Sequence, residues 1–281
     1  MIKPSAANRA YGLCDPNAEA PPPRRSRVIR STRAFTLPAA ALILGGLLMA
    51  GSLSAFSSPT DNAGNTWAAA AVFAADVELA NGWTTGLTHA VGTGNDRLLI
   101  FVAGMENNGD RDLTAVSYGG QAMTQANQQV ICSGFCARNE VWYLDEAGIQ
   151  AAGGTGFAVT WGGVANAFDE MYSAVTLRNV DQATPIGDTS SAATTTANPI
   201  QVATALNVTT GDMVLTGATS GNASSYTPDT GYTEGTDQAA ASSTMATAYL
   251  SITSNGTEQP SATYDAAINR QTITGTVINH A

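Results

Sequence analysis

Short apolar stretches separated by polar, glycine-rich segments recur along the chain from residue 56 onward. Residues 97–103 are apolar on both faces of an extended strand, which is typical of a strand in the middle of a sheet. Residues 113–118 and 121–125 flank Gly119-Gly120, and two glycines can supply the positive φ angles of a tight hairpin turn. No segment after residue 56 shows convincing helical spacing of apolar residues. The pattern therefore predicts an all-β fold.

Further strands are expected wherever β-branched and aromatic residues cluster between Gly, Asn, Asp and Ser. They fall at residues 140–144, 156–161, 171–180, 200–208, 212–219, 245–252, 261–264 and 272–279. About ten strands of this kind are expected to form a two-layer antiparallel β-sandwich spanning residues 56–281, because each sheet must bury a face.

The two halves of this region share a faint pattern, which indicates two pseudo-repeats at about residues 85–190 and 199–281. Tyr143-Leu144 followed by Thr160-Trp161 has a counterpart in Tyr249-Leu250 followed by Thr263-Tyr264. The alternative is that any two β-rich stretches share such patterns. If the repeat is real, each half supplies about five strands to one sandwich, with the polar stretch 190–199 as the boundary.

The first 55 residues differ in kind from the rest. A basic stretch at residues 24–33 precedes an apolar run at 35–50 and a small, polar exit at 51–55. This order predicts a signal peptide and export to the cell surface or the extracellular space. A retained N-terminal anchor is the alternative. Ala34-Phe35 also lies in a stretch that resembles a type IV prepilin cleavage region, which leaves a pilin-like subunit as a weaker hypothesis.

Charge is divided unevenly along the chain. From residue 56 onward the only basic residues are five arginines, against 20 acidic residues, and lysine is absent. Such a surface repels phosphate backbones and anionic headgroups, so no nucleic-acid partner is expected and a membrane is expected only through the N-terminal segment.

Cys132 and Cys136 are the two cysteines that remain once the predicted leader is set aside. In an exported loop two cysteines most often pair, so we expect a disulfide. A zinc site is less favoured because the chain has only two histidines, His89 and His280, and neither is near in sequence.

A family resemblance is visible in the middle of the chain. Its motifs are Val-Ser-Tyr-Gly-Gly-Gln-Ala-Met-Thr at 116–124, Val-Trp-Tyr-Leu at 141–144 and Thr-Leu-Arg-Asn-Val-Asp-Gln-Ala-Thr-Pro-Ile at 176–186. Together they resemble a group of uncharacterised secreted bacterial and phage-associated β-sandwich proteins. The resemblance covers roughly residues 85–190 and implies a jelly-roll or lectin-like sandwich. It brings no catalytic residues with it.

Oxygen-bearing side chains alternate between residues 106 and 112, a spacing that suits a calcium loop. Glu106, Asn108, Asp110 and Asp112 are the predicted ligands. The stretch departs from the EF-hand pattern because Arg111 intrudes and no bidentate Glu follows, so a solvated turn is the alternative. Calcium is the only cofactor that the sequence suggests.

Glycan-binding modules present aromatic rings on one face. Tyr172, on a predicted strand, and Tyr226 and Tyr232, on glycine-rich loops, are the predicted glycan-binding residues. Core packing is the competing role for them.

Catalytic patterns are weak, and the sequence favours a protein that is not an enzyme. Glycan hydrolysis needs two carboxylates flanking one bond, but Glu140 and Asp145 are predicted on opposite faces of a strand, as are Asp169 and Glu170. No Gly-x-Ser-x-Gly elbow is present for a serine hydrolase.

The sequence thus favours a non-catalytic extracellular or cell-surface protein with a structural or adhesive role. Its expected partners are itself, through strand edges, or surface glycans. The stretch 67–75 could pair with an edge of a neighbouring copy as a donor strand, but the favoured interpretation is that it forms the first strand of its own sheet. A calcium-dependent carbohydrate-binding module is the alternative, with a glycan-active hydrolase behind it.

Overall fold

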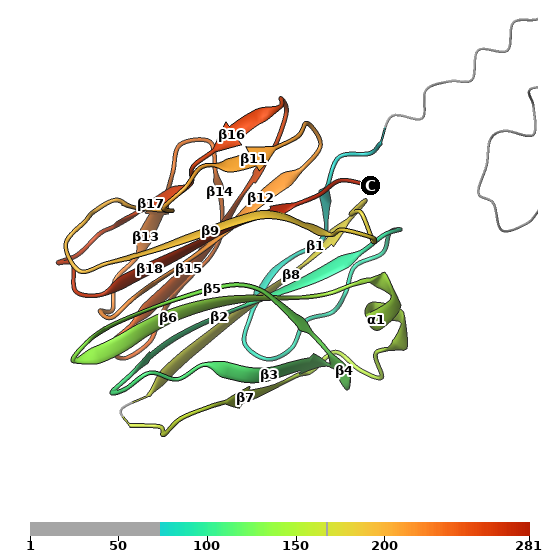
Figure 1. The fold of residues 1–281 in the computed structure, drawn as a ribbon. Coiled ribbons are helices and arrows are strands. Elements are labelled where there is room, and N and C mark those ends of the chain that lie inside the picture. The colour runs from blue at the N-terminus through green and yellow to red at the C-terminus, as the bar shows by residue number, and fades with distance from the viewer. Residues whose placement is uncertain (1–73, 167) are drawn as a thin grey trace, which may run out of the picture. The chain divides into compact units, whose positions relative to one another are not determined.

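The computed structural model describes residues 74–166 and 168–281, which form a nearly all-β structure (Figure 1). The leader predicted at 1–55 and most of the candidate donor strand at 67–75 lie outside the described residues. The first half contains β1 (Glu78–Thr85), β2 (Leu98–Asn107), β3 (Leu113–Tyr118), β4 (Gln121–Ala122), β5 (Thr124–Ser133), β6 (Phe135–Leu144), α1 (Glu146–Ala151), β7 (Phe157–Trp161) and β8 (Asp169–Arg178). The second half contains β9 (Ile186–Thr194), β10 (Ile200–Gln201), β11 (Leu206–Val208), β12 (Met213–Ser220), β13 (Tyr226–Pro228), β14 (Thr233–Ala239), β15 (Thr244–Ser251), β16 (Gly256–Glu258), β17 (Ser261–Tyr264) and β18 (Gln271–Ile278).

Each half forms one large sheet and a smaller outer layer. The first large sheet has the antiparallel order β1-β8-β2-β6-β5, and the small sheet β4-β3-β7 covers one of its faces. The second large sheet has the order β14-β15-β12-β18-β9, and it is covered by the small sheets β10-β17-β13 and β11-β16.

The two large sheets face each other and share a core (Figure 1). Strand β2 shows how the sequence produces this arrangement, because all ten of its residues are buried. Leu98, Ile100 and Val102 point into the core shared with the second large sheet. Leu99 and Phe101 point the other way, into the core beneath the first outer layer. Because successive side chains of a strand point to opposite faces, β2 contributes to both cores.

The large sheets have the same strand order when their strands are numbered along the chain. In each half the first strand pairs with the fifth, the fifth with the second, the second with the fourth, and the fourth with the third. The outer layers match as well, since β3 pairs with β7 in the first half and β13 pairs with β17 in the second.

Part of the shared interior is polar. The Nδ2 group of Asn139 donates to Thr219 Oγ1 at 3.1 Å, and Thr274 Oγ1 donates to Asn139 Oδ1 at 2.7 Å. The close approach of the Asn139 side chain, from β6, to the backbone of β12 requires glycine at position 217. A Cβ there would lie 2.6 Å from the Asn139 Oδ1 oxygen. A buried amide with both ends satisfied fixes the relative position of the two sheets.

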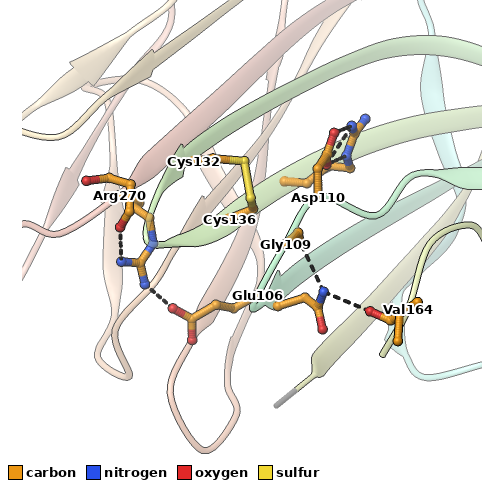
Figure 2. The surroundings of a disulfide bond; sticks show 10 residues. Glu106, Gly109, Asp110, Cys132, Cys136, Val164 and Arg270 are labelled. Carbon is orange, nitrogen blue, oxygen red and sulfur yellow. Dashed lines mark hydrogen bonds and ion pairs between the residues drawn. A yellow bond between two sulfur atoms is a disulfide. The ribbon is translucent and has the colours of Figure 1, made fainter. Parts of the chain in front are cut away.

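The ion pair between Arg270 and Glu106 joins the two halves at the end of the interior near the disulfide (Figure 2). Both side chains are buried, at 7% and 3% exposure. Arg270 also donates to the Ser133 carbonyl at 3.3 Å and lies 5.7 Å from the centre of the Phe135 ring. A residue of the second half therefore holds the tip of the β5–β6 hairpin in the first.

The predicted disulfide between Cys132 and Cys136 is confirmed, and it closes this hairpin tip (Figure 2). The two cysteines lie directly opposite each other in the pairing of β5 with β6. Gly134, at the turn, has a φ of +77°, a conformation that glycine adopts without steric cost. The crosslink thus fixes the loop that Arg270 contacts.

The predicted all-β antiparallel sandwich is confirmed, whereas the strand number is underestimated, since eighteen strands rather than about ten occur in the described residues. The jelly-roll type stays a prediction. The strands that were missed are short or lie at sheet edges, among them β1, β9 and β14. The stretch 190–199, predicted as a boundary between the halves, begins inside β9.

The helix α1 is not predicted from the sequence. Asp145 caps it by accepting the Gly148 N–H at 2.8 Å. Among the described residues, none of the helices is both long and apolar enough to cross a membrane.

Replacing Arg270 with alanine tests the joint between the halves. We expect R270A to lower the free energy of unfolding by about 3–5 kcal/mol, because it leaves the Glu106 carboxylate buried without its partner. The measurement is urea unfolding followed by tryptophan fluorescence. The control is R178A, which breaks the exposed pair with Glu78 and should cost less than about 1 kcal/mol. Equal losses in the two variants would show that the buried pair does not join the halves.

Candidate functional site

The four predicted calcium ligands do not converge. Glu106 extends into the interior between the large sheets, where it pairs with Arg270. Asp110 is bound instead by Arg138, whose guanidinium donates to both carboxylate oxygens at 2.8 and 2.9 Å. Arg138 also pairs with Glu140, which accepts the N–H of Leu113 on the outer layer, so this group lies on the other face of the first large sheet.

Asn108 and Asp112 are exposed on the intervening loop. Within residues 74–166 and 168–281 there is no group of three or more His, Cys, Asp or Glu side chains that could hold a metal ion. The prediction of a calcium site at residues 106–112 is therefore wrong, because arginines neutralise two of its carboxylates on opposite faces of the sheet.

Two of the three predicted glycan-binding tyrosines are core residues. Tyr172 is 6% exposed, stacks on Phe101 at a ring separation of 5.5 Å, and donates from its hydroxyl to Glu170 at 2.8 Å. Tyr226 is 3% exposed and donates to Gln271 at 3.0 Å. Burial raises the pKa of both hydroxyls. The prediction that they present rings to a ligand is wrong, because both rings fill the space beneath an outer layer.

Tyr232 is half-buried, and its ring packs against the apolar cluster beneath β11 and β16. Burial raises the pKa of its hydroxyl, and the nearby carboxylates of Glu258 and Asp229 add to this. The sequence placed this ring in solvent because it follows a glycine, but the loop folds back onto the sheet.

The carboxylates considered for hydrolysis are engaged by different partners. Glu140 is fully buried and accepts from Gln125 at 2.7 Å and from the Trp142 indole at 3.1 Å. Burial raises the pKa of its carboxyl, while the N–H of Leu113 and the charge of Arg138 oppose the rise. Asp145 caps α1, and Asp169 accepts from the Ser242 backbone at 2.7 Å. None of the predicted pairs shares a common partner.

The two histidines have different hydrogen-bond partners. His89 is 2% exposed, and its ring nitrogens hydrogen-bond to the hydroxyls of Thr84 and Thr176, each at 2.8 Å. Burial lowers its pKa, which favours the neutral ring. His280 lies 2.8 Å from Asp212 Oδ1 near the C-terminus.

A small cavity of about 10 Å³ lies beneath the outer layer of the second half, which is about the space of one water molecule. Its lining is mainly apolar and includes Thr216, Tyr226, Pro228, Glu234, Ala246 and Ala248. Alanine side chains on β12, β15 and β17 form much of its wall. Pro228 is half-buried and Glu234 is exposed, so the cavity reaches the surface at this rim.

The rim of the cavity is acidic. Asp237, which lies opposite Ala246 in the pairing of β14 with β15, accepts the Tyr226 N–H at 3.0 Å. Burial raises the pKa of its carboxyl, and the negative charges of Glu234 and Asp265 raise it further. An anionic ligand would be repelled from this rim. Neither the alanines nor Pro228 carried a sequence signal that could have pointed to the cavity.

A wider, open hollow is lined by polar residues of the loop 94–97 and by Glu146 and Gln150 of α1. Its charged groups already bind each other. Arg97 donates to the two Glu146 oxygens at 2.5 and 2.9 Å, and Glu146 also accepts the Arg97 backbone N–H at 2.8 Å. Arg97 and Glu146 of this hollow are therefore already hydrogen-bonded to each other rather than free to bind a ligand.

Comparison of the chain with models of protein families, with curated proteins and with solved structures finds no match.

The contact between Arg97 and Glu146 predicts a specific pH dependence. The hydrogen bonds from Arg97 lower the pKa of Glu146 from 4.5 to about 2. A lowered folded-state pKa gives stability that is fully present above about pH 4.5 and is lost as the pH falls toward 2. The free energy of unfolding, measured with urea, should therefore fall more between pH 6 and pH 3 in the wild type than in E146Q. Equal falls in the two proteins would show that Arg97 does not lower the pKa of Glu146.

Calcium should not stabilise the described sandwich through residues 106–112. A ligand present at 100 times its dissociation constant adds about 2.7 kcal/mol to the free energy of unfolding. We expect thermal melting to be the same in millimolar calcium and in chelator. A calcium-dependent rise that is lost in D112N, which changes an exposed predicted ligand and breaks no ion pair, would reinstate the site.

Proposed function

We propose that the protein is a non-catalytic extracellular or cell-surface β-sandwich with an adhesive role. The observation that carries this proposal is the joint between its halves, in which one core and several buried polar contacts hold two covered sheets as a single body. A surface protein that transmits force or presents a ligand site needs such a body, because independent halves would separate under load.

The disulfide and the charge distribution support a location outside the cytoplasm. A short-range disulfide at a hairpin tip persists in oxidising compartments. Four of the five arginines in the described residues bind carboxylates, and Arg111 donates to the Gly162 carbonyl at 2.7 Å beneath the Phe168 ring. The solvent-facing charge is therefore largely negative, which suits neutral partners better than anionic ones.

The matching strand order of the two large sheets supports a duplicated origin for the halves. The pairing registers agree with the repeat proposed from the sequence, since Leu144 lies opposite Leu99 and Leu250 lies opposite Val214. We take the halves to be copies of one jelly-roll-like unit, as the resemblance to secreted bacterial and phage-associated sandwiches implies.

Between the two partners expected from the sequence, the strand edges favour glycans over self-association. The edge strand β1 has two register shifts against β8 and carries Glu78. The edge strand β14 has one shift and carries Glu234 and Asp237. Irregular, charged edges disfavour pairing with a second copy.

The secreted protein should run as a monomer in size-exclusion chromatography with light scattering, and it should bind neutral glycans on an array without releasing sugar. Retention of intact glycans supports the adhesive role. Release of reducing sugar would overturn the non-catalytic assignment, and filaments in electron micrographs would replace adhesion with self-assembly. A monomer that binds no glycan would also count against adhesion to sugars.

A further inference from the structure

The pairing registers make the two halves comparable residue by residue. In the first half Phe101 lies between Ala174 and Trp142, and in the second half Thr216 lies between Gly275 and Ala248. Two residues further along β2, Ala103 lies opposite Glu140. The corresponding residue on β12, Ala218, lies opposite Ala246.

The comparison shows that large side chains in the first half are replaced by small ones in the second. Phe101, Glu140 and Trp142 fill the space beneath the first outer layer and are all buried. Their counterparts are Thr216, Ala246 and Ala248, which line the cavity of the second half. The cavity is thus a place where this fold can hold a group that the second half does not supply itself.

The first half also shows what kind of group fits there. Trp142 places an apolar body in the space and donates its indole N–H to a carboxylate, Glu140, at 3.1 Å. Gln125, which lies opposite Trp142, corresponds to Glu234, which lies opposite Ala248. The second half therefore has a carboxylate, Glu234, where the first half has the amide of Gln125, and it lacks the apolar body with an N–H.

We propose that this cavity binds the acetamido group of an N-acetylated neutral glycan, which rests on the adhesive function proposed above. The methyl group enters the alanine-lined cavity, whose volume of about 10 Å³ admits little more than one small group. The amide N–H donates to Glu234 at the exposed rim. The negative charge of Glu234 and Asp237 excludes glycans that carry carboxylates or sulfates.

The first test titrates the full secreted chain with three trisaccharides, using calorimetry and saturation-transfer NMR. They are the N-acetylglucosamine trimer, its de-N-acetylated form and the glucose trimer. We expect binding of the acetylated trimer, at least about tenfold weaker binding of the glucose trimer, and the strongest saturation on the acetyl methyl protons. Equal binding of the acetylated and glucose trimers would overturn the proposal, as would tighter binding of the de-N-acetylated trimer.

Two variants locate the site. A248L fills the cavity from its wall and should abolish binding of the acetylated trimer. E234A removes the exposed acceptor and should weaken binding about tenfold, the effect of losing a hydrogen bond to a charged group. The control is E258A, which removes a carboxylate of β16 that does not line the cavity and should leave binding unchanged. Thermal melting establishes that each variant is folded, and E234A carries the test if A248L is not.

The results of these experiments distinguish failure of the cavity as the binding site from failure of the proposed adhesive function. Glycan binding on the array that survives in both E234A and A248L would refute this cavity as the site and leave the adhesive role standing. An absence of all glycan binding would refute both.

Discussion

The central strands β2 and β12 are buried along their whole length on both faces, and the arrangement of the other strands follows from this. A sheet whose middle strand is apolar on both faces must be covered twice. One small outer sheet in the first half and two in the second cover one face of the large sheet, and the large sheet of the other half covers the other face. Neither large sheet could keep its inner face from water alone, so the halves are bound to each other by the same effect that folds them.

The polar contacts within this apolar joint have a different role from the apolar ones. Burying the charges of Glu106 and Arg270 costs desolvation energy that their attraction only partly offsets. Burying the neutral amide of Asn139 also has a desolvation cost, which its hydrogen bonds with Thr219 of β12 and Thr274 of β18 offset. These groups add little net stability, but they tolerate only one alignment of the sheets. Apolar side chains hold the halves together, and the polar ones determine how they align.

The sequence predicts the strands that are apolar and misses the strands that are not. Residues 97–103 and 212–219 are predicted as strands because burial on both faces favours apolar residues along most of a strand. Strands β1, β9 and β14 lie at sheet edges, where half the surface meets water and the alternation of polar and apolar residues is weak. The disulfide was predictable because it depends on two neighbouring residues. The arginine partners of Glu106 and Asp110 were not, because Arg270 is 164 residues from Glu106 in the chain. The cavity was hidden for another reason: alanines reveal a space only by comparison with the larger residues at matching positions.

The contacts of the five arginines have a consequence for how the described residues resist proteolysis. Proteases of the trypsin type need a lysine or arginine in an extended, accessible segment of chain. From residue 74 onward the chain offers no lysine, and its arginines have their guanidinium groups bound to carboxylates or carbonyl oxygens. A protease of this type would first have to break these contacts before it could bind an arginine side chain. The arginine contacts that stabilise the folded chain therefore also limit its cleavage by proteases of the trypsin type.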